Sequence, residues 1–274
     1  MKHIAWIVAG LVLLVLSGCA ENERLRKPVT YRTSARENFE KGKRAFEDGD
    51  YLEAMELFKF VKNKFPYSKY ATESDLLMAD CLFKRDKYLE AAEAYENFVK
   101  LHPRHPKVAY AMFQAASCHY EKIPSDWFLV PPAYEMDQTE TRTALRKFQQ
   151  FLARWPQHEL SGKARKLLDD CKRLMANRSM YIAEFYRKRE KYRGVVWRAE
   201  EILHKYSGVG FDEKALYLKA EALAQLGDTA AAVQAIEKLL ERFPKGEWTA
   251  DARKLLDRIK AVEAKRAAAA RSSK

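Results

Sequence analysis

Apolar residues recur at every third or fourth position through most of this chain, a spacing typical of amphipathic α-helices. Residues 34–66 show the pattern first, as two such runs separated by Gly49-Asp50. Glycine accepts the backbone angles that a tight turn needs, and proline ends a helix, so this turn and Pro66 limit the two runs. The sequence therefore predicts one helix over 34–47 and a second over 51–64.

A few residues at fixed offsets define this helix pair. Gly42 is small enough to let the two helices approach closely, Ala54 packs near it, and Phe58 fills the remaining gap. The same offsets return, once in a weaker form, at Lys87-Tyr88, Ala91, Tyr95 and Pro103; at Ala144, Phe148 and Pro156; at Lys191-Tyr192, Val195 and Tyr206; and at Gly227, Asp228, Ala232, Ile236 and Pro244. The recurrence predicts five related units.

This spacing resembles the tetratricopeptide repeat, a helix pair of about 34 residues. One helix pair cannot bury its apolar faces alone, whereas stacked pairs bury them against one another and leave a concave groove. We therefore expect an all-α fold, a tetratricopeptide-repeat α-solenoid of about five helix pairs. The further helices are expected over 70–85, 88–101, 107–120, 141–154, 159–189, 192–206, 211–226, 229–242 and 247–263.

Three segments depart from the regular repeat. An insertion over 121–140 carries three prolines and the apolar run Trp127–Val130; it either has a function or folds back over the edge of the repeats. Residues 163–193 contain no Gly or Pro between their ends, which predicts one long helix, with Asn177 as the place where it could break. A basic tail over 264–274 is expected to be flexible.

The N-terminus predicts how the protein is held in its compartment. Ile4–Leu16 is apolar, but as a helix it would span only roughly 20 Å, against about 30 Å of bilayer hydrocarbon. It fits the core of a signal peptide over 1–18. Leu16-Ser17-Gly18-Cys19 resembles the bacterial lipoprotein signal, in which Cys19 is lipidated, and Ala20 after it favours the outer membrane of a Gram-negative envelope. The alternative is an ordinary signal with a free cysteine; residues 19–33 predict a polar tether.

The net charge is +12, from 50 basic and 38 acidic residues. This balance favours anionic partners. Both signs are mixed along the chain, however, so a solvated surface is the preferred explanation of the charge. No nucleophile elbow, phosphate loop, zinc signature or dinucleotide fingerprint is present in the sequence, so we expect a binding scaffold, not an enzyme, and no cofactor. His102 and His105 lie among prolines that force an extended backbone, which disfavours a metal site.

The remaining cysteines are Cys81, Cys118 and Cys171, an odd number that argues against a disulfide framework. We expect buried thiols between helices. The first helix of each of the first three pairs is expected to line the groove with aromatic and basic side chains. These are Arg36, Phe39, Lys43 and Phe46; Leu76, Asp80, Phe83 and Lys84; and Tyr110, Phe113 and Tyr120. Rings with cations suit a peptide that carries aromatic side chains and a free C-terminal carboxylate; the alternative for each ring is packing between repeats.

Several longer segments resemble the BamD family, lipoproteins of the outer-membrane β-barrel assembly machine. They are Phe65-Pro66-Tyr67-Ser68, Leu101-His102-Pro103-Arg104-His105-Pro106, Tyr110 with Met112-Phe113, Tyr181-Ile182-Ala183-Glu184-Phe185-Tyr186 and Val195-Val196-Trp197-Arg198. The lipoprotein signal and the five repeats agree with this resemblance. The residues Trp127 to Tyr134 depart from the family, which leaves contacts of the insertion with other lipoproteins open.

The resemblance implies partners and roles. The N-terminal repeats, over 34–120, would receive the C-terminal targeting strand of unfolded outer-membrane proteins. The C-terminal repeats, over 141–263, would hold the periplasmic POTRA region of the barrel protein BamA, with Arg198 paired to an acidic residue there. Other lipoproteins of the machine would be further partners, and no nucleic acid is expected. Two alternatives stay open: a repeat lipoprotein that scaffolds peptidoglycan or envelope machinery, and a DNA-uptake lipoprotein.

Overall fold

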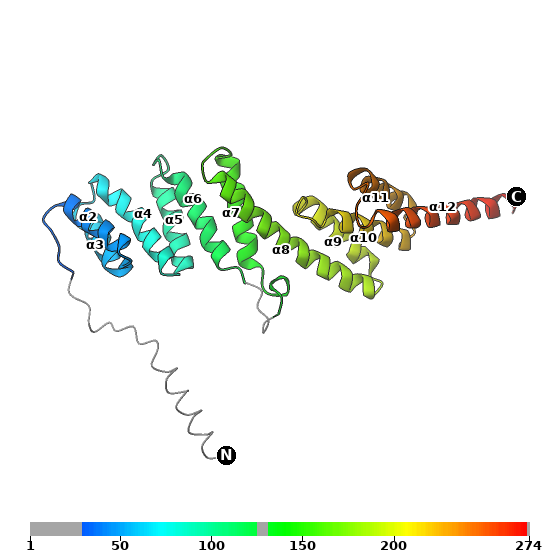
Figure 1. The fold of residues 1–274 in the computed structure, drawn as a ribbon, viewed down its shortest axis with the longest axis horizontal. Helices are drawn as coiled ribbons and strands as arrows, with labels where there is room; N and C mark the ends of the chain where they lie inside the picture. The colour runs from blue at the N-terminus through cyan, green and yellow to red at the C-terminus, as the bar shows by residue number, and fades with distance from the viewer. Residues whose placement is uncertain (1–28, 125–130, 273–274) are drawn as a thin grey trace, which may run out of the picture. The chain divides into compact units, whose positions relative to one another are not determined.

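The computed structural model describes residues 29–124 and 131–272, and every regular element in these ranges is helical (Figure 1). The signal peptide, Cys19 and most of the tether lie outside the described residues, as do 125–130. The elements are α2 (Ala35–Glu47), α3 (Tyr51–Lys64), α4 (Lys69–Lys84), α5 (Tyr88–Leu101), α6 (Val108–Glu121), the 3₁₀ turn η2 (Ala133–Glu135), α7 (Thr139–Arg154), α8 (Ser161–Lys188), α9 (Tyr192–Lys205), α10 (Asp212–Gln225), α11 (Thr229–Arg242) and α12 (Thr249–Ser272). The predicted all-α fold is confirmed.

The chain divides into two compact units, residues 1–74 and 75–274, and the division falls inside α4. In the first unit α2 packs against α3. In the second unit each helix from α5 to α12 packs against the next one along the chain, which is the arrangement of an α-solenoid (Figure 1). The functional division at the insertion, between 34–120 and 141–263, stays a prediction.

The turn inside each helix pair has one recurring geometry. Gly49 and Gly227 have φ angles of 85° and 83°, values at which glycine carries no steric penalty. The aspartate after each glycine caps the next helix: Asp50 accepts from the Glu53 amide and Asp228 from the Ala231 amide, both at 3.1 Å. The repeat is thus encoded locally where Gly-Asp is present.

Two other turns reach the same geometry without glycine. Asp86 and Glu190 stand at the equivalent positions and have φ angles of 58° and 57°. The left-handed region is unfavourable for such residues, and the following Lys87 and Lys191 provide no side-chain cap. Packing of the paired helices therefore imposes the turn where the local sequence favours it least.

The predicted small-on-large packing is present in the first unit. Ala54 and Phe58 have no exposed surface. A Cβ atom at Gly42 would lie 2.8 Å from Cε1 of Phe58, closer than carbon atoms can approach without a shift. In the second unit the corresponding alanines and the large residues four positions later are also fully buried: Ala91 and Tyr95, Ala144 and Phe148, and Ala232 and Ile236.

The long helix is confirmed, and the break near Asn177 is not found. α8 runs without interruption from Ser161 to Lys188. It packs against α7 and also against α9 and the insertion, so one helix serves two successive repeats. The absence of Gly and Pro allows the continuous backbone hydrogen bonding that this requires.

The last helix does not end at residue 263 as predicted. α12 continues to Ser272, because Ala, Arg and Lys dominate residues 264–272 and no Gly or Pro interrupts them. Residues 273 and 274 lie outside the described range. Within the described residues, no helix has both the length and the apolar character needed to cross a bilayer.

Replacing Gly42 with alanine should lower the free energy of unfolding by about 1–3 kcal/mol, because the added methyl group overpacks the contact with Phe58. Gly162 is a suitable control, since a Cβ atom there meets nothing within 4 Å. Gly162→Ala should leave stability unchanged or raise it by up to about 1 kcal/mol. Urea titration followed by circular dichroism checks both; equal stability of the two variants would contradict the packing argument.

Candidate functional site

The predicted groove residues of the first unit lie on α2 and divide into two groups. Phe39 is only 3% exposed, and its ring centroid lies 5.8 Å from that of Phe58 and 5.1 Å from that of Tyr70. Its assignment to a ligand-binding groove is therefore wrong, because a phenylalanine ring gains most from full burial. Arg36 is exposed and Lys43 and Phe46 are half-buried, so these three remain accessible to a ligand.

In the second unit, Asp80 connects three helices. Its carboxylate on α4 accepts a hydrogen bond of 2.5 Å from the Tyr95 hydroxyl on α5 and one of 2.8 Å from the Tyr110 hydroxyl on α6. The Gln114 amide donates in turn to the Tyr110 hydroxyl at 3.2 Å. The structure therefore brings together two residues, Asp80 and Tyr110, that the sequence assigned to one groove from separate repeats.

Electrostatics at this cluster follow from its burial. Burial raises the pKa of Asp80, and the hydrogen bonds from Tyr95 and Tyr110 offset only part of that rise. The pKa values of the two tyrosines are also raised, first by burial and then by the nearby Asp80 carboxylate. Both hydroxyls therefore stay protonated and act as donors at neutral pH.

Leu76 and Phe113, two further expected groove residues, belong to the core. Leu76 is 1% exposed and Phe113 is 2% exposed, with its ring 5.9 Å from Phe148 and 5.8 Å from Phe151. The interpretation as packing between repeats applies to Phe113, and its place in the groove is wrong. Phe83, half-buried against Tyr88, and Lys84, exposed, remain accessible.

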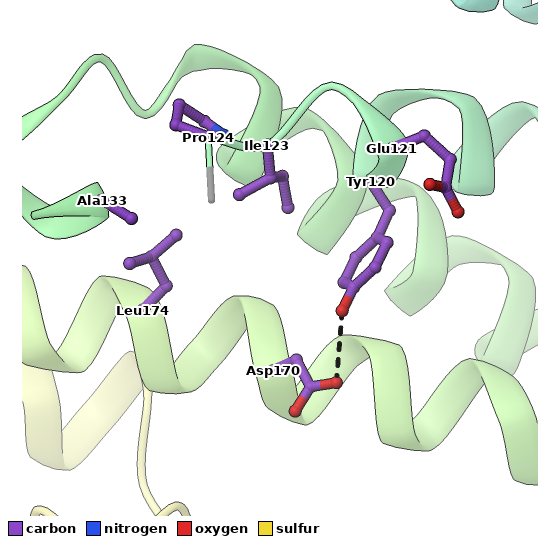
Figure 2. Close-up of a pocket in the computed structure, with 7 residues that line it drawn as sticks. All are labelled: Tyr120, Glu121, Ile123, Pro124, Ala133, Asp170 and Leu174. Atoms are coloured by element: carbon purple, nitrogen blue, oxygen red, sulfur yellow. Dashed lines mark hydrogen bonds between the residues drawn. The ribbon is translucent and has the colours of Figure 1, made fainter. Parts of the chain in front are cut away.

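Tyr120, the last expected groove residue, is half-buried at the end of α6. Its ring meets Phe148 edge-on at 6.4 Å, and its hydroxyl lies 3.4 Å from Oδ2 of Asp170 on α8 (Figure 2). The ring thus combines packing on one side with a polar contact on the other.

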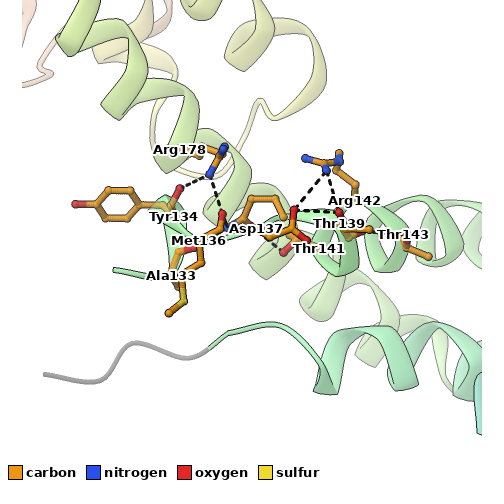
Figure 3. A network of polar contacts seen from close by, with 10 residues as sticks. Ala133, Tyr134, Met136, Asp137, Thr139, Thr141, Arg142, Thr143 and Arg178 are labelled. Carbon is orange, nitrogen blue, oxygen red and sulfur yellow. Dashed lines mark hydrogen bonds and ion pairs between the residues drawn. The ribbon is translucent and has the colours of Figure 1, made fainter. Parts of the chain in front are cut away.

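The described part of the insertion folds back onto α8 (Figure 3). The Arg178 guanidinium donates through Nη1 to the carbonyls of Tyr134 at 2.9 Å and Met136 at 2.8 Å. The ring of Tyr134 packs 5.3 Å from that of Tyr181. One arginine and one ring pair therefore attach this segment to the helix shared by two repeats.

A second set of bonds closes the segment on itself. Gln138 is 1% exposed, and its amide donates to the carbonyls of Ala133 at 2.6 Å and Met136 at 3.1 Å. The Thr141 hydroxyl donates to its Oε1 at 2.9 Å. The apolar run Trp127–Val130 lies outside the described residues.

Arg198, the expected partner-binding residue, lies on α9 in a polar network. Its Nη1 is 2.8 Å from Oε2 of Glu201, which also accepts 2.9 Å from the Ser179 hydroxyl on α8. Nε of Arg198 is buried and forms no hydrogen bond within the described part of the chain. Burial alone would raise the pKa of Glu201, but the bonds from Arg198 and Ser179 outweigh it and lower that pKa. Both charges of the pair are therefore present at neutral pH.

An exposed tryptophan accompanies Arg198. Trp197 is 59% exposed, and the Arg198 guanidinium lies 4.5 Å from its ring centroid. Exposed tryptophan and arginine side chains are the residues that most often dominate protein–protein binding energy. The sequence assigned Arg198 and left Trp197 without a role, although Trp197 falls off the stripe of buried residues set by Val195 and Ala199.

Two more rings are exposed on α8, one helical turn apart. Tyr181 is 45% exposed and Phe185 is 46% exposed, and the Arg189 guanidinium lies 3.7 Å from the Phe185 ring. Soluble proteins seldom leave such rings exposed in groups unless a partner covers them.

Comparison with known proteins gives the family. The model of YfiO, described as an outer membrane lipoprotein, matches residues 32–235. The chain belongs to the YfiO family of outer membrane lipoproteins. The match spans both units and includes Arg198 and the expected groove residues.

Curated relatives agree and confirm the resemblance to BamD. Outer membrane protein assembly factor BamD of Caulobacter vibrioides is 26% identical over 92% of this chain and 80% of its own length. The protein of the same name from Neisseria meningitidis is 26% identical over 86% of this chain and 90% of its own. That of Haemophilus influenzae is 27% identical, over 85% and 87%. These alignments cover at least 80% of this chain and of each relative.

Among solved structures, a tetratricopeptide repeat protein from Parabacteroides merdae is 18% identical, with 85% of this chain and 88% of that chain covered. The TM-score is 0.37. A similarity at this level carries no argument about function.

The cysteines of this YfiO-family chain are buried thiols, as predicted. Cys81, Cys118 and Cys171 are free and at most 1% exposed. Burial raises the pKa of each thiol to about 12. Cys19, the expected lipidation site, lies outside the described residues.

The two histidines between the second and third pairs have packing roles. The rings of His102 and His105 lie 5.1 Å and 5.2 Å from the ring of Phe98. Nδ1 of His105 accepts from the Lys107 amide at 3.2 Å. Over residues 29–124 and 131–272, no group of His, Cys, Asp or Glu side chains is arranged to hold a metal ion.

Ellman's reagent should react with none of the three buried thiols of the native protein at pH 8, because a thiol with a pKa of about 12 is almost fully protonated and these are also inaccessible. All three should react in guanidinium chloride. A Cys19→Ser variant removes any signal from an unmodified N-terminal cysteine. Rapid reaction of any native thiol would contradict the burial described.

Proposed function

We propose that this protein is a non-enzymatic scaffold in the assembly of outer-membrane proteins. The observation that carries the proposal is the family match over residues 32–235, joined by relatives that are named outer membrane protein assembly factor BamD. The helical repeats support it, since stacked helix pairs offer extended surfaces for polypeptides. Lipidation at Cys19 would hold the protein on the periplasmic face of the outer membrane.

The substrate would be the C-terminal targeting strand of an unfolded outer-membrane protein. The accessible candidates are Arg36, Lys43 and Phe46 in the first unit, and Phe83, Lys84, Tyr110 and Tyr120 in the second. Their cations suit a terminal carboxylate, and their half-buried rings suit an aromatic side chain. The hydrogen bond to Asp80 fixes the orientation of the Tyr110 ring.

The partner at the C-terminal repeats would be the POTRA region of a BamA-like barrel protein. Arg198 would pair there with an acidic residue of the partner, through donors that Glu201 leaves open. The Arg198 guanidinium has N–H donors besides the Nη1 that bonds Glu201, and the exposed Trp197 beside it supplies apolar area. An arginine already oriented by Glu201 loses less conformational entropy on binding.

Arg198→Glu should release the BamA-like partner, because it places a carboxylate beside Glu201 and opposite an acidic partner residue. We expect a loss of affinity of about 30-fold or more in pull-down and surface plasmon resonance. Arg187→Glu is the matched control, since it also breaks an ion pair on the neighbouring helix, with Glu184 at 2.8 Å. Unchanged recovery of the partner with Arg198→Glu, at native helicity, would refute the assignment.

The variant Phe83→Ala/Lys84→Ala should weaken a fluorescein-labelled peptide that ends in an aromatic residue with a free carboxylate, by about tenfold. The loss follows from removal of one half-buried ring and one exposed cation. Lys87→Ala/Leu89→Ala, at exposed positions of the same unit, is the control. Fluorescence anisotropy measures both; equal affinity of the two variants would remove Phe83 and Lys84 from the site. Phe39 is unsuitable for this test because it belongs to the core.

A further inference from the structure

The end of the predicted tether is docked on the first helix pair. Asn38 on α2 is fully buried, and its side chain accepts from the Arg32 amide at 2.7 Å and donates to the Arg32 carbonyl at 2.8 Å. The Lys41 ammonium donates to the Thr30 carbonyl at 2.9 Å. This part of the tether therefore belongs to the folded first unit, and the place where the chain reaches the unit is fixed.

Tyr31 marks that place. Its ring stacks on the ring of Phe60 on α3, with the centroids 4.2 Å apart and the planes at 19°. Phe60 in turn meets the ring of Phe65 edge-on at 6.2 Å. Tyr31 follows Cys19 by twelve positions, and a stretch of that length extends at most about 43 Å. A lipid on Cys19 would therefore keep these three rings within that distance of the membrane.

The segment that carries two of these rings is basic. Residues 59–70 contain no acidic residue and four lysines, all exposed: Lys59, Lys62, Lys64 and Lys69. The acidic residues that flank the segment in the sequence, Glu56 and Glu73, are fewer than its lysines, so the local charge stays positive. Such a segment attracts anions, because charges farther away than about 8 Å are screened at physiological ionic strength.

Two tyrosine rings of the first unit are exposed near these lysines. Tyr67 is fully exposed in the turn between α3 and α4, which the Ser68 amide closes by donating to the Phe65 carbonyl at 3.0 Å. Tyr31 keeps 45% of its surface exposed although it stacks on Phe60. Tyrosine rings suit the headgroup level of a membrane, and lysines next to them reach the phosphates of anionic lipids.

We propose that this surface, formed by Tyr31, Phe60, Tyr67 and the four lysines, binds the headgroups of anionic phospholipids in the membrane that holds the anchor. The inference rests on the proposed function, since acyl chains on Cys19 bring the surface to a bilayer, which favours headgroups over an acidic polypeptide. A weak contact is sufficient, because a short tether gives an effective concentration in the millimolar range. The contact would set which side of the first helix pair faces the bilayer, which a tether alone cannot do.

The test uses the full mature chain with Cys19→Ser, so that acyl chains do not mask the contact. Cosedimentation at physiological salt should show binding to mixed vesicles of phosphatidylglycerol and phosphatidylcholine, and none to phosphatidylcholine alone. Lys59→Gln/Lys64→Gln/Lys69→Gln should lower the partition coefficient by about 100-fold, since each lysine near an anionic surface contributes roughly fivefold.

The control is Lys238→Gln/Lys245→Gln/Lys260→Gln, which removes the same charge at exposed positions of the second unit. It should bind the mixed vesicles nearly as well as the parent chain, because screened charges outside the contact add little. The pair of variants thus separates this surface from the net charge of +12.

A fluorescent label tests the contact directly. Tyr67→Cys provides a thiol for an environment-sensitive nitrobenzoxadiazole label, and labelling is selective because the other three cysteines are buried. Its emission should shift to the blue on mixed vesicles, as expected for a dye that enters the headgroup region. The same label at Lys238→Cys, an exposed position of the second unit, should keep its aqueous emission.

Three results would overturn the proposal: no binding to the mixed vesicles, equal binding of the two lysine variants at native helicity, or a bound chain whose label at position 67 keeps its aqueous emission. A label that responds to the C-terminal targeting peptide and not to vesicles would also overturn it, by assigning the surface to a polypeptide. Mass spectrometry of the mature lipoprotein tests the anchor separately. An unmodified Cys19 would refute that part of the proposed function, whatever the vesicles show.

Discussion

Each helix pair depends on one contact. An alanine on the second helix leaves room for the two helices to approach, and a large side chain four residues later on the same helix packs against the first helix. Ala54, Ala91, Ala144 and Ala232 occupy the small position, and all are fully buried. The close approach leaves no spare volume, as the 2.8 Å distance from a Cβ at Gly42 to Phe58 shows. Because a single pair leaves its outer apolar faces uncovered, the stack continues until a last helix, α12, covers the end.

The aromatic residues of the chain fall into two groups, rings that are buried in the core and rings that remain accessible. Phenylalanines such as Phe113 and Phe148 are buried in the core, where they remove the most apolar area from water. Two of the rings that remain accessible have a polar partner or an arginine: Tyr110 donates to Asp80, and Trp197 packs against Arg198. Binding surfaces on this scaffold are therefore formed by the rings that the core does not use.

Charge acts locally on these surfaces, and the net charge of +12 does not describe them. Exposed charges are screened beyond about 8 Å at physiological ionic strength, so a ligand senses only the nearest groups. Arg198 is held by Glu201, and the Asp80 carboxylate lies among tyrosines. One basic chain can thus present surfaces of different sign to different segments of a polypeptide.

Local periodicity in the sequence was sufficient for the helices and their pairing. The spacing of Ala and Phe, the Gly-Asp turns and the stretch without breakers over 163–193 predicted the limits of most helices to within a residue or two. The end of α12 was misplaced, because basic composition was interpreted as a tail although alanine and arginine favour a helix. The absence of a break at Asn177 likewise required no information beyond the missing Gly and Pro.

Only the tertiary structure decided which side of each helix is free. Phe39 and Phe113 have groove spacing, yet neighbouring rings cover them. The contact of Tyr120 with Asp170, 50 residues away, and the bonds from Arg178 to the insertion join segments with no shared pattern. A helical period specifies which residues share a face, but what that face meets depends on helices elsewhere in the chain, and that information is not present in any local stretch.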